Sequence, residues 1–192
     1  MKYFAVLFLF FFSLKLCAQQ KQFSLNEDGK YVFYEVVDVK TISKDILMAR
    51  AKVFINKLDK EVVKNHVLTD TSIFAKGKFV IDKTVLIAGH PSGEVSYNLT
   101  FEARNGKYRF WLTDFEYIPY QRNRYGNYVA TTKIGTPLEK STSKLNMGEW
   151  KANVSAAYNK VEKLSADFKE FLSRNPIVNP LENNKTKVND KW

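Results

Sequence analysis

Apolar and polar residues alternate along residues 95–103, and this alternation is the clearest structural pattern in the chain. One set of positions is apolar: Val95, Tyr97, Leu99, Phe101 and Ala103. The intervening set is polar: Ser96, Asn98, Thr100 and Glu102. Because successive side chains of a strand point to opposite faces, the pattern predicts an antiparallel strand with one buried face and one wet face.

Other segments rich in β-branched and aromatic residues are also predicted to be strands. They cover residues 30–39, 72–81, 84–88 and 107–118. Residues that favour turns separate these segments: Asp82-Lys83, His90-Pro91-Ser92-Gly93 and Asn105-Gly106. Asn-Gly is a strong hairpin sequence because both residues tolerate a positive φ. A loop is expected through Asn65-His66, and Tyr120–Gly135 is expected to be irregular.

Two segments show the spacing of amphipathic helices. In the first, Ser43 is a candidate N-cap, and the apolar positions that follow it step by four, three and four: Leu47, Ala51, Phe54 and Leu58. The second helix is expected to start at Asn146, which forms a capping-box pattern with Glu149. Asn175-Pro176 should end it, because the residue before proline disfavours the helical region.

The second helix carries a long apolar stripe with steps of four and three: Trp150, Val154, Ala157, Val161, Leu164, Phe168 and Phe171. This spacing is typical of one helix face that packs on a sheet. It also resembles a short heptad pattern, so self-association through this helix is the alternative.

The N-terminal segment is typical of a secretory signal peptide. Met1-Lys2 is followed by an apolar run from Tyr3 to Leu14, which is too short for a bilayer-spanning anchor of roughly 20 residues. Cleavage is expected between Ala18 and Gln19. Lipidation of Cys17 is the alternative, although a bulky Leu16 precedes it. The predicted organisation is a signal peptide (1–18), a lead-in (19–28), one domain (29–175) and a polar disordered tail (176–192).

Loss of the signal peptide changes the charge and the chemistry of the chain. It removes Lys2 and Lys15, which lowers the formal charge from +10 to +8. It also removes Cys17, the only cysteine, and so excludes disulfides, thiolate metal sites and cysteine nucleophiles in the mature chain. A charge of +8 either attracts polyanions or only keeps a lysine-rich surface solvated. Nucleic acid is not an expected partner of an exported protein.

The sequence offers few candidates for catalysis or metal binding. His66 and His90 match no zinc-ligand spacing, and Ser92 lacks the Gly-x-Ser-x-Gly context of a serine nucleophile. Asp114 and Glu116 lie two apart on a predicted strand and would share one face, as paired carboxylates in a glycosidase could. A solvent-facing acidic strand is the alternative. No cofactor and no metal are expected.

The densest cluster of aromatic and planar polar residues follows the last long strand. We predict that this cluster is a ligand-binding site. Its members are Tyr117, Tyr120, Arg122, Arg124, Tyr125 and Tyr128, with Asn123 among them. Tyrosine and arginine dominate binding hot spots, so the cluster favours a glycan or peptide ligand. The alternative is a hairpin whose tyrosines pack on its own stem.

Three short stretches carry a resemblance to a known family. They are Gly29-Lys30-Tyr31 with Tyr34–Val37, the segment Ser43–Lys52, and Asn105–Phe110. Over roughly residues 29–118 the chain resembles an uncharacterised domain of exported Bacteroidota proteins, described as having a TATA-binding-protein-like (TBP-like) fold. The resemblance implies an α+β fold with a single curved antiparallel sheet of about five strands and two helices on one face. It implies no activity and no functional residues.

The leading hypothesis is an exported, non-catalytic binding or assembly module of the bacterial cell envelope, periplasmic or extracellular. Its partner would be a glycan, peptide or protein of the envelope, with membrane association only if Cys17 is lipidated. An envelope hydrolase that uses carboxylates and a polyanion-binding protein are the alternatives.

Overall fold

The computed structural model describes residues 22–58, 62–85, 88–140 and 146–174. The predicted signal peptide, Cys17, the cleavage site between Ala18 and Gln19, and the polar tail 176–192 lie outside the described residues. No helix within the described ranges is long and apolar enough to cross a membrane.

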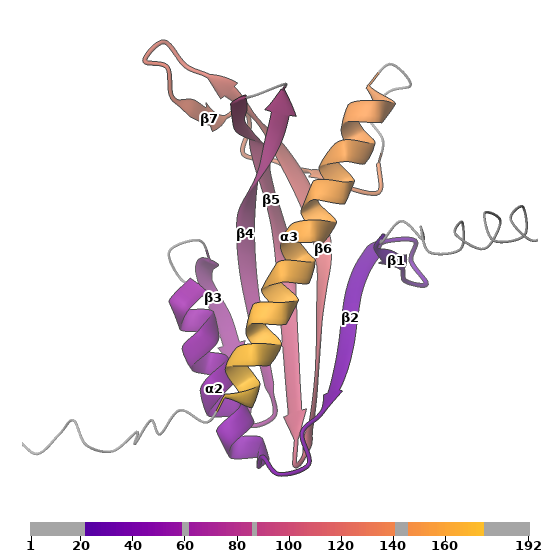
Figure 1. Cartoon of the computed structure of the whole chain (residues 1–192), viewed down its shortest axis with the longest axis vertical. Coiled ribbons are helices and arrows are strands. Elements are labelled where there is room, and N and C mark those ends of the chain that lie inside the picture. Colours follow the sequence, from indigo (N-terminus) through magenta and orange to yellow (C-terminus); the bar gives the residue numbers. More distant parts are fainter. Residues whose placement is uncertain (1–21, 59–61, 86–87, 141–145, 175–192) are drawn as a thin grey trace, which may run out of the picture.

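An open antiparallel sheet forms the body of the protein (Figure 1). The strand order is β1-β2-β6-β5-β4-β3, and two short strands, β7 and β8, also pair with β6. The strands are β1 (Ser24–Leu25), β2 (Tyr31–Asp38), β3 (Val62–Leu68), β4 (Ser72–Val85), β5 (Ala88–Arg104), β6 (Lys107–Arg122), β7 (Tyr128–Ala130) and β8 (Thr136–Pro137). The predicted α+β class with one antiparallel sheet is confirmed, but the described sheet has eight strands instead of about five.

Two helices, α2 (Lys44–Lys57) and α3 (Met147–Ser173), lie on the same face of the sheet (Figure 1). Ser43 caps α2 as predicted, with its side chain accepting a hydrogen bond from the backbone N–H of Ile46. The predicted capping box of Asn146 and Glu149 is wrong, because the side chain of Asn146 makes no capping hydrogen bond. The backbone of Asn146, at φ −105° and ψ 12°, is not in the extended conformation that turns a side chain toward the first N–H groups.

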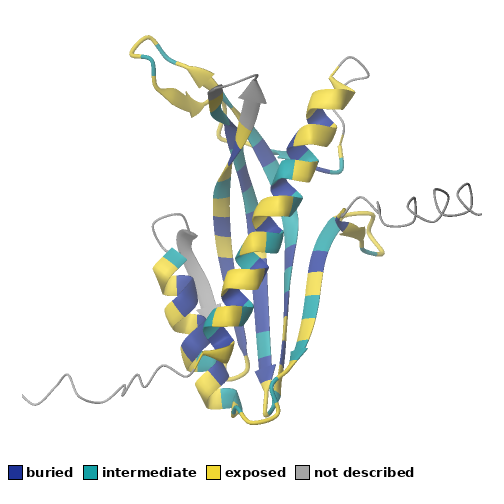
Figure 2. Ribbon diagram, viewed as in Figure 1, coloured by how far each residue is buried: buried dark blue, intermediate teal, exposed yellow. Residues whose placement is uncertain are grey.

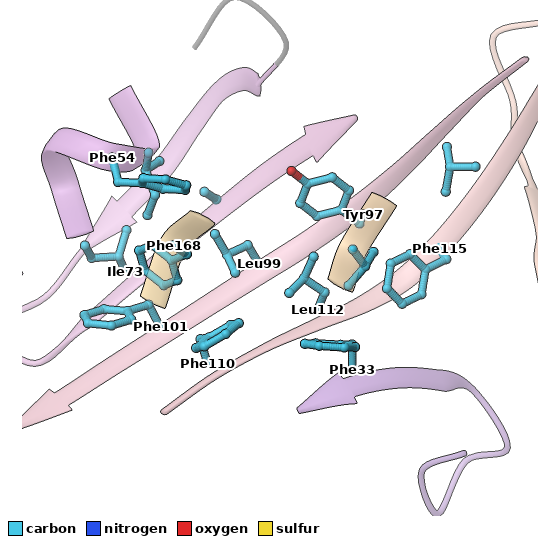
Figure 3. Packing of buried hydrophobic residues seen from close by; sticks show 14 of the residues in the cluster. Phe33, Phe54, Ile73, Tyr97, Leu99, Phe101, Phe110, Leu112, Phe115 and Phe168 are labelled. Atoms are coloured by element: carbon cyan, nitrogen blue, oxygen red, sulfur yellow. The ribbon is translucent and has the colours of Figure 1, made fainter. Parts of the chain in front are cut away.

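The core lies between the helices and the inner face of the sheet (Figures 2 and 3). Phe168 of α3 is near its centre, with ring centroids 4.9 Å from Phe54, 5.5 Å from Phe101 and 5.2 Å from Phe110. Ala157 and Val161 of the predicted stripe are also fully buried. The stripe on α3 therefore packs on the sheet, and the residues that suggested self-association are largely occupied by the core.

The hairpin of β4 and β5 corrects several turn predictions. Residues 72–81 and 84–88 are not separate strands, because β4 runs without a break to Val85 and β5 starts at Ala88. The turns expected at Asp82-Lys83 and His90–Gly93 are wrong, since both segments lie within strands. A bulge absorbs the irregular residues: Ile81 pairs with Gly93 and Asp82 with Pro91, which leaves one extra residue on β5.

Two further segments expected to lack regular structure contain strands. The loop prediction at Asn65-His66 is wrong, because both residues belong to β3, which pairs with β4 on either side of a register shift. The prediction of an irregular Tyr120–Gly135 is also partly wrong. β6 continues to Arg122, and β7 folds back on it to form a second hairpin.

Candidate functional site

The hairpin of β6 and β7 extends beyond the helix-covered part of the sheet (Figure 1). We call residues 120–130 the arm. Its strands pair Tyr120 with Ala130 and Arg122 with Tyr128. The arm holds every residue of the predicted ligand-binding cluster except Tyr117.

The turn at the end of the arm is held by its own hydrogen bonds. The side-chain oxygen of Asn123 accepts from the backbone N–H groups of Tyr125 and Asn127, each at 3.0 Å. Gly126 takes a positive φ of 84° and donates its N–H to the carbonyl of Asn123. Arg122 Nε donates to the carbonyl of Gly126 at 3.2 Å. The tip is therefore an ordered turn that presents its side chains outward.

Most residues of the arm are exposed (Figure 2). Tyr125 is 73% exposed, and the guanidinium of Arg124 lies 4.8 Å from its ring centroid. Tyr128 is 37% exposed and stacks on His90 at 5.1 Å with ring planes 5° apart. Tyr125 is thus free to contact a ligand, whereas Tyr128 is partly used to attach the arm to β5.

The other two tyrosines of the predicted cluster lie away from the tip. Tyr117 is only 7% exposed, donates its hydroxyl to the carbonyl of Ser92 at 3.0 Å, and packs edge-on against Trp150. Tyr120 donates to Glu94 Oε2 at 2.7 Å. Burial, followed by this hydrogen bond, raises the pKa of Tyr120 to about 12. The structure therefore brings Arg122, Arg124, Tyr125 and Tyr128 together and separates Tyr117 and Tyr120 from them.

The predicted carboxylate pair lies at a bulge in β6. Ser96 pairs with Glu116 but Asn98 pairs with Thr113, so the register shifts between them, and Asp114 takes a positive φ of 53°. Asp114 accepts hydrogen bonds from Lys30 Nζ at 2.6 Å and from Asn98 Nδ2 at 2.9 Å. The Lys30 contact holds the pKa of Asp114 below its usual range. An ion-paired aspartate on the face away from the helices is a poor general acid, since that role needs a raised pKa.

The described residues contain no group of three or more histidine, cysteine or carboxylate side chains placed to hold a metal. His90 faces the ring of Tyr128, and the backbone of His66 is part of β3.

A second exposed aromatic surface was missed by the sequence reasoning. On the face opposite the helices, strand register places Tyr34, Trp111, Thr100 and Phe74 in one row across β2, β6, β5 and β4. Tyr34 and Phe74 are exposed, and Arg109 lies 5.4 Å from the ring of Trp111. Thr100 is only 8% exposed, which corrects its assignment to a wet face. The sequence held one signal of this surface: Tyr34, Trp111 and Phe74 occupy outward-facing positions of three strands, where polar residues are expected.

The largest described cavity, of about 330 Å³, lies beside the start of α3. Its walls are mainly apolar and include Phe23, Leu138, Trp150 and Tyr158. Trp150 Nε1 donates to the carbonyl of Leu138 at 3.0 Å, so the indole is already held by the protein.

Comparison with known proteins identifies the fold but indicates no activity. A family model described as a domain of unknown function (DUF4468) with TBP-like fold matches residues 33–118. The chain is similar to the crystal structure of a TBP-like protein from Parabacteroides distasonis, with 16% identity and a TM-score of 0.59 over 78% of this chain and 96% of that chain. It is also similar to a DUF4468 family protein from Bacteroides ovatus, with 14% identity and a TM-score of 0.53 over 78% of this chain and 90% of that chain.

A comparison with curated proteins finds no match to this chain. At identities this low, the two solved structures inform the fold alone. The family resemblance seen in the sequence over residues 29–118 is confirmed by the family match, and both structures confirm the fold. Residues 33–118 of this chain match the model of the DUF4468 family, and the chain has a TBP-like fold.

Proposed function

We propose that the chain is an exported, non-catalytic binding module of the bacterial cell envelope, and that the tip of the arm is its binding surface. The observation that carries this proposal is the presence of Arg122, Arg124, Tyr125 and Tyr128 on one projecting hairpin. An exposed tyrosine beside fixed guanidinium groups is the chemistry that dominates binding hot spots. The N-terminal pattern of residues 1–18 supports the exported location.

The charge around the arm indicates the sign of the ligand. No Asp or Glu occurs from Tyr117 to Leu138, while this segment holds Arg122, Arg124 and Lys133. The segment is therefore uniformly basic in a chain that elsewhere mixes both signs. An anionic component of the envelope is the complementary partner. The leading hypothesis and the polyanion hypothesis thus converge on one surface.

Retention on isolated envelope material tests the proposal. The chain from Gln19 onward retains every element described above and is the protein to use. Arg124→Gln combined with Tyr125→Ala should weaken retention by roughly tenfold or more, because truncation of a hot-spot residue costs more than about 1 kcal/mol. The melting temperature should change little, since the tip buries little apolar surface.

A matched control removes one exposed tyrosine and one exposed cation elsewhere. Tyr34→Ala combined with Lys52→Gln changes the charge by the same amount on β2 and α2, away from the arm. This control should keep full retention. Equal losses in the two double variants would show that diffuse charge, and not the arm, holds the protein. Retention that survives added salt would indicate ring contacts, because screening weakens exposed charge pairs first.

The second candidate, a hydrolase acting through Asp114 and Glu116, has no observation in its favour. Asp114 is committed to Lys30 and Asn98. Its lowered pKa keeps it ionised, whereas a glycosidase needs one carboxyl group that holds its proton.

A further inference from the structure

We infer that the arm docks on a membrane surface rich in anionic phospholipid, without a lipid anchor at Cys17. This inference rests on the proposed binding function and names its ligand class. It follows from three properties of residues 117–138: exposed apolar side chains, uniform positive charge, and backbone groups that are already hydrogen-bonded.

Two loops of this segment expose large apolar side chains. Tyr125, at the tip of the arm, is 73% exposed, and Ile134, in the loop that leads to β8, is 82% exposed. Tyr128 and Val129, between them in the chain, are exposed as well. Tyrosine is enriched where proteins meet the headgroup level of a bilayer, because its ring is apolar and its hydroxyl is polar. An exposed branched aliphatic side chain such as Ile134 adds apolar area that a membrane surface can bury.

Basic residues flank both exposed apolar side chains. Arg124 lies over the ring of Tyr125 at 4.8 Å, so its guanidinium is held at the level of the ring. Lys133 directly precedes Ile134, and Arg122 lies at the base of the tip. The segment itself has no carboxylate between Tyr117 and Leu138. Glu94, which contacts it through Tyr120, is ion-paired with Lys78, and Glu116 lies against Gly135. Each such cation near an anionic leaflet contributes about fivefold in affinity, which corresponds to about 1 kcal/mol.

The turn at the tip satisfies most of its backbone N–H groups within the protein, and the second loop satisfies two of its own, those of Thr131 and Ile134. At the tip, Asn123 accepts from the N–H groups of Tyr125 and Asn127, and Gly126 donates to Asn123. In the second loop, the N–H of Ile134 donates to Thr132 Oγ1 at 3.1 Å.

This self-sufficiency favours a lipid surface over a glycan. A loop with internally paired N–H groups enters a region of low polarity without leaving donors unsatisfied. A glycan site, by contrast, relies on free donors and acceptors to pair with sugar hydroxyls. The exposed side chains of the tip include a ring and two guanidinium groups, which match an acyl boundary and a phosphate layer.

Co-sedimentation with vesicles tests the inference directly. The chain from Gln19 onward should bind vesicles of equal parts phosphatidylglycerol and phosphatidylcholine and should bind pure phosphatidylcholine vesicles much more weakly. Arg122→Gln with Arg124→Gln should lower the partition coefficient by about 25-fold, at fivefold per charge. Lys52→Gln with Lys163→Gln removes the same charge from exposed positions on α2 and α3 and should lower it less than about threefold.

Insertion of the ring is tested by fluorescence. In Tyr125→Trp, lipids brominated on the acyl chains should quench the added indole, and the excess quenching over the parent chain reports its depth. Absence of that excess quenching would overturn ring insertion and with it the inference.

The remaining outcomes separate the two proposals. If the vesicles bind no protein while envelope material still retains it through the arm, the lipid inference is wrong and a glycan or protein ligand is indicated. If arm and control variants lose vesicle binding equally, diffuse charge is responsible and the inference is again wrong. If neither vesicles nor envelope material bind, the proposed function is overturned as well.

Discussion

Tyr97 on β5 covers Gly77 on β4 so closely that a β-carbon at position 77 would lie 2.5 Å from the Cζ and Oη atoms of the ring. The two residues are register partners in the β4–β5 pairing, and Tyr97 is buried. An aromatic ring laid over a glycine of the neighbouring strand restores packing that the missing side chain would otherwise forfeit. Gly93 is covered by a ring as well, although its register partner is Pro119: a β-carbon there would lie 2.5 Å from Tyr117 Cε2 and 2.4 Å from the carbonyl oxygen of Ile118.

Gly77→Ala should therefore destabilise the protein by about 1–3 kcal/mol, because the buried ring of Tyr97 must move out of a well-packed core. Urea unfolding measures the change. Gly89→Ala is the matched control on the adjoining strand, since a β-carbon there meets nothing within 4 Å. In a Tyr97→Ala background, Gly77→Ala should cost much less, and additive costs would show that the ring is not the cause.

Arg50 connects the two helices, and its loss should lower the stability of the protein. Its Nη1 donates to the carbonyl of Leu172, at the end of α3, at 2.6 Å, and the side chain is buried. Arg50→Met keeps much of the buried stem but removes the charged donor. We expect a loss of about 1.5–3 kcal/mol in the free energy of unfolding, typical of a hydrogen bond to a charged group. Lys52→Met, exposed on the same helix, should change stability by less than about 0.5 kcal/mol.

Neighbouring residues on β5 allow a test of both faces of the sheet. Leu99→Ala should cost about 2–5 kcal/mol, because Leu99 is buried on the inner face. Thr100→Ala should cost an intermediate amount, near 1 kcal/mol, since Thr100 is covered by its outer-face neighbours Trp111 and Phe74. Lys76→Ala, exposed on the outer face of β4, should cost less than either. Calorimetry of the three variants gives the order, and a Thr100 effect no larger than that of Lys76 would show that the outer row does not pack.

The ion pair of Asp114 predicts a specific dependence on pH. Because the pKa of Asp114 is lower in the folded chain, its ionisation stabilises the fold above the unfolded pKa, and this contribution disappears as the pH falls through the folded value. The loss therefore occurs below about pH 4. Asp114→Asn should melt slightly below the parent chain at neutral pH, and the difference should shrink in acid. A difference that stays constant from pH 7 to about pH 2 would exclude the carboxylate as its source.

The backbone of Asp114 gives an independent prediction. A φ of 53° is tolerated by Asp, Asn and Gly but not by β-branched residues. Asp114→Val should therefore lose about 1–3 kcal/mol through strain, measured by urea unfolding. Asp114→Gly should recover most of that loss although it also lacks the carboxylate. Equal destabilisation by the two variants would mean that the ion pair, and not the backbone, dominates.

Local periodicity was enough to find the elements that fold by short-range rules. The alternation from Val95 to Ala103 placed every apolar residue of that strand on the buried face, and Ser43 marked the start of α2. The stripe of α3 packed on the sheet because a helix with one apolar face has few other ways to bury it.

Features that depend on pairing between distant strands were not visible in the sequence. The two bulges arise only when β5 lies beside β4 and β6, so Pro91 and Gly93 looked like a turn and Asp114 looked like a regular strand residue. The membership of the candidate site could not be predicted for the same reason. Tyr117 and Tyr125 are close in sequence, but β6 carries one into the core and the other to the tip of the arm.

The bulge at Asp114 has a consequence for how the protein could tolerate change. Before it, the inward positions of β6 are even-numbered, as at Leu112, and after it they are odd-numbered, as at Phe115 and Tyr117. Deleting Asp114 would remove the bulge and leave Phe115 and Tyr117 facing the core in regular alternation with Leu112. A regular strand that kept Asp114 would instead turn both rings toward solvent and Glu116 toward the helices. The extra residue therefore shifts the inward-facing positions of β6 by one, and this shift decides to which face of the sheet the side chains of the arm point.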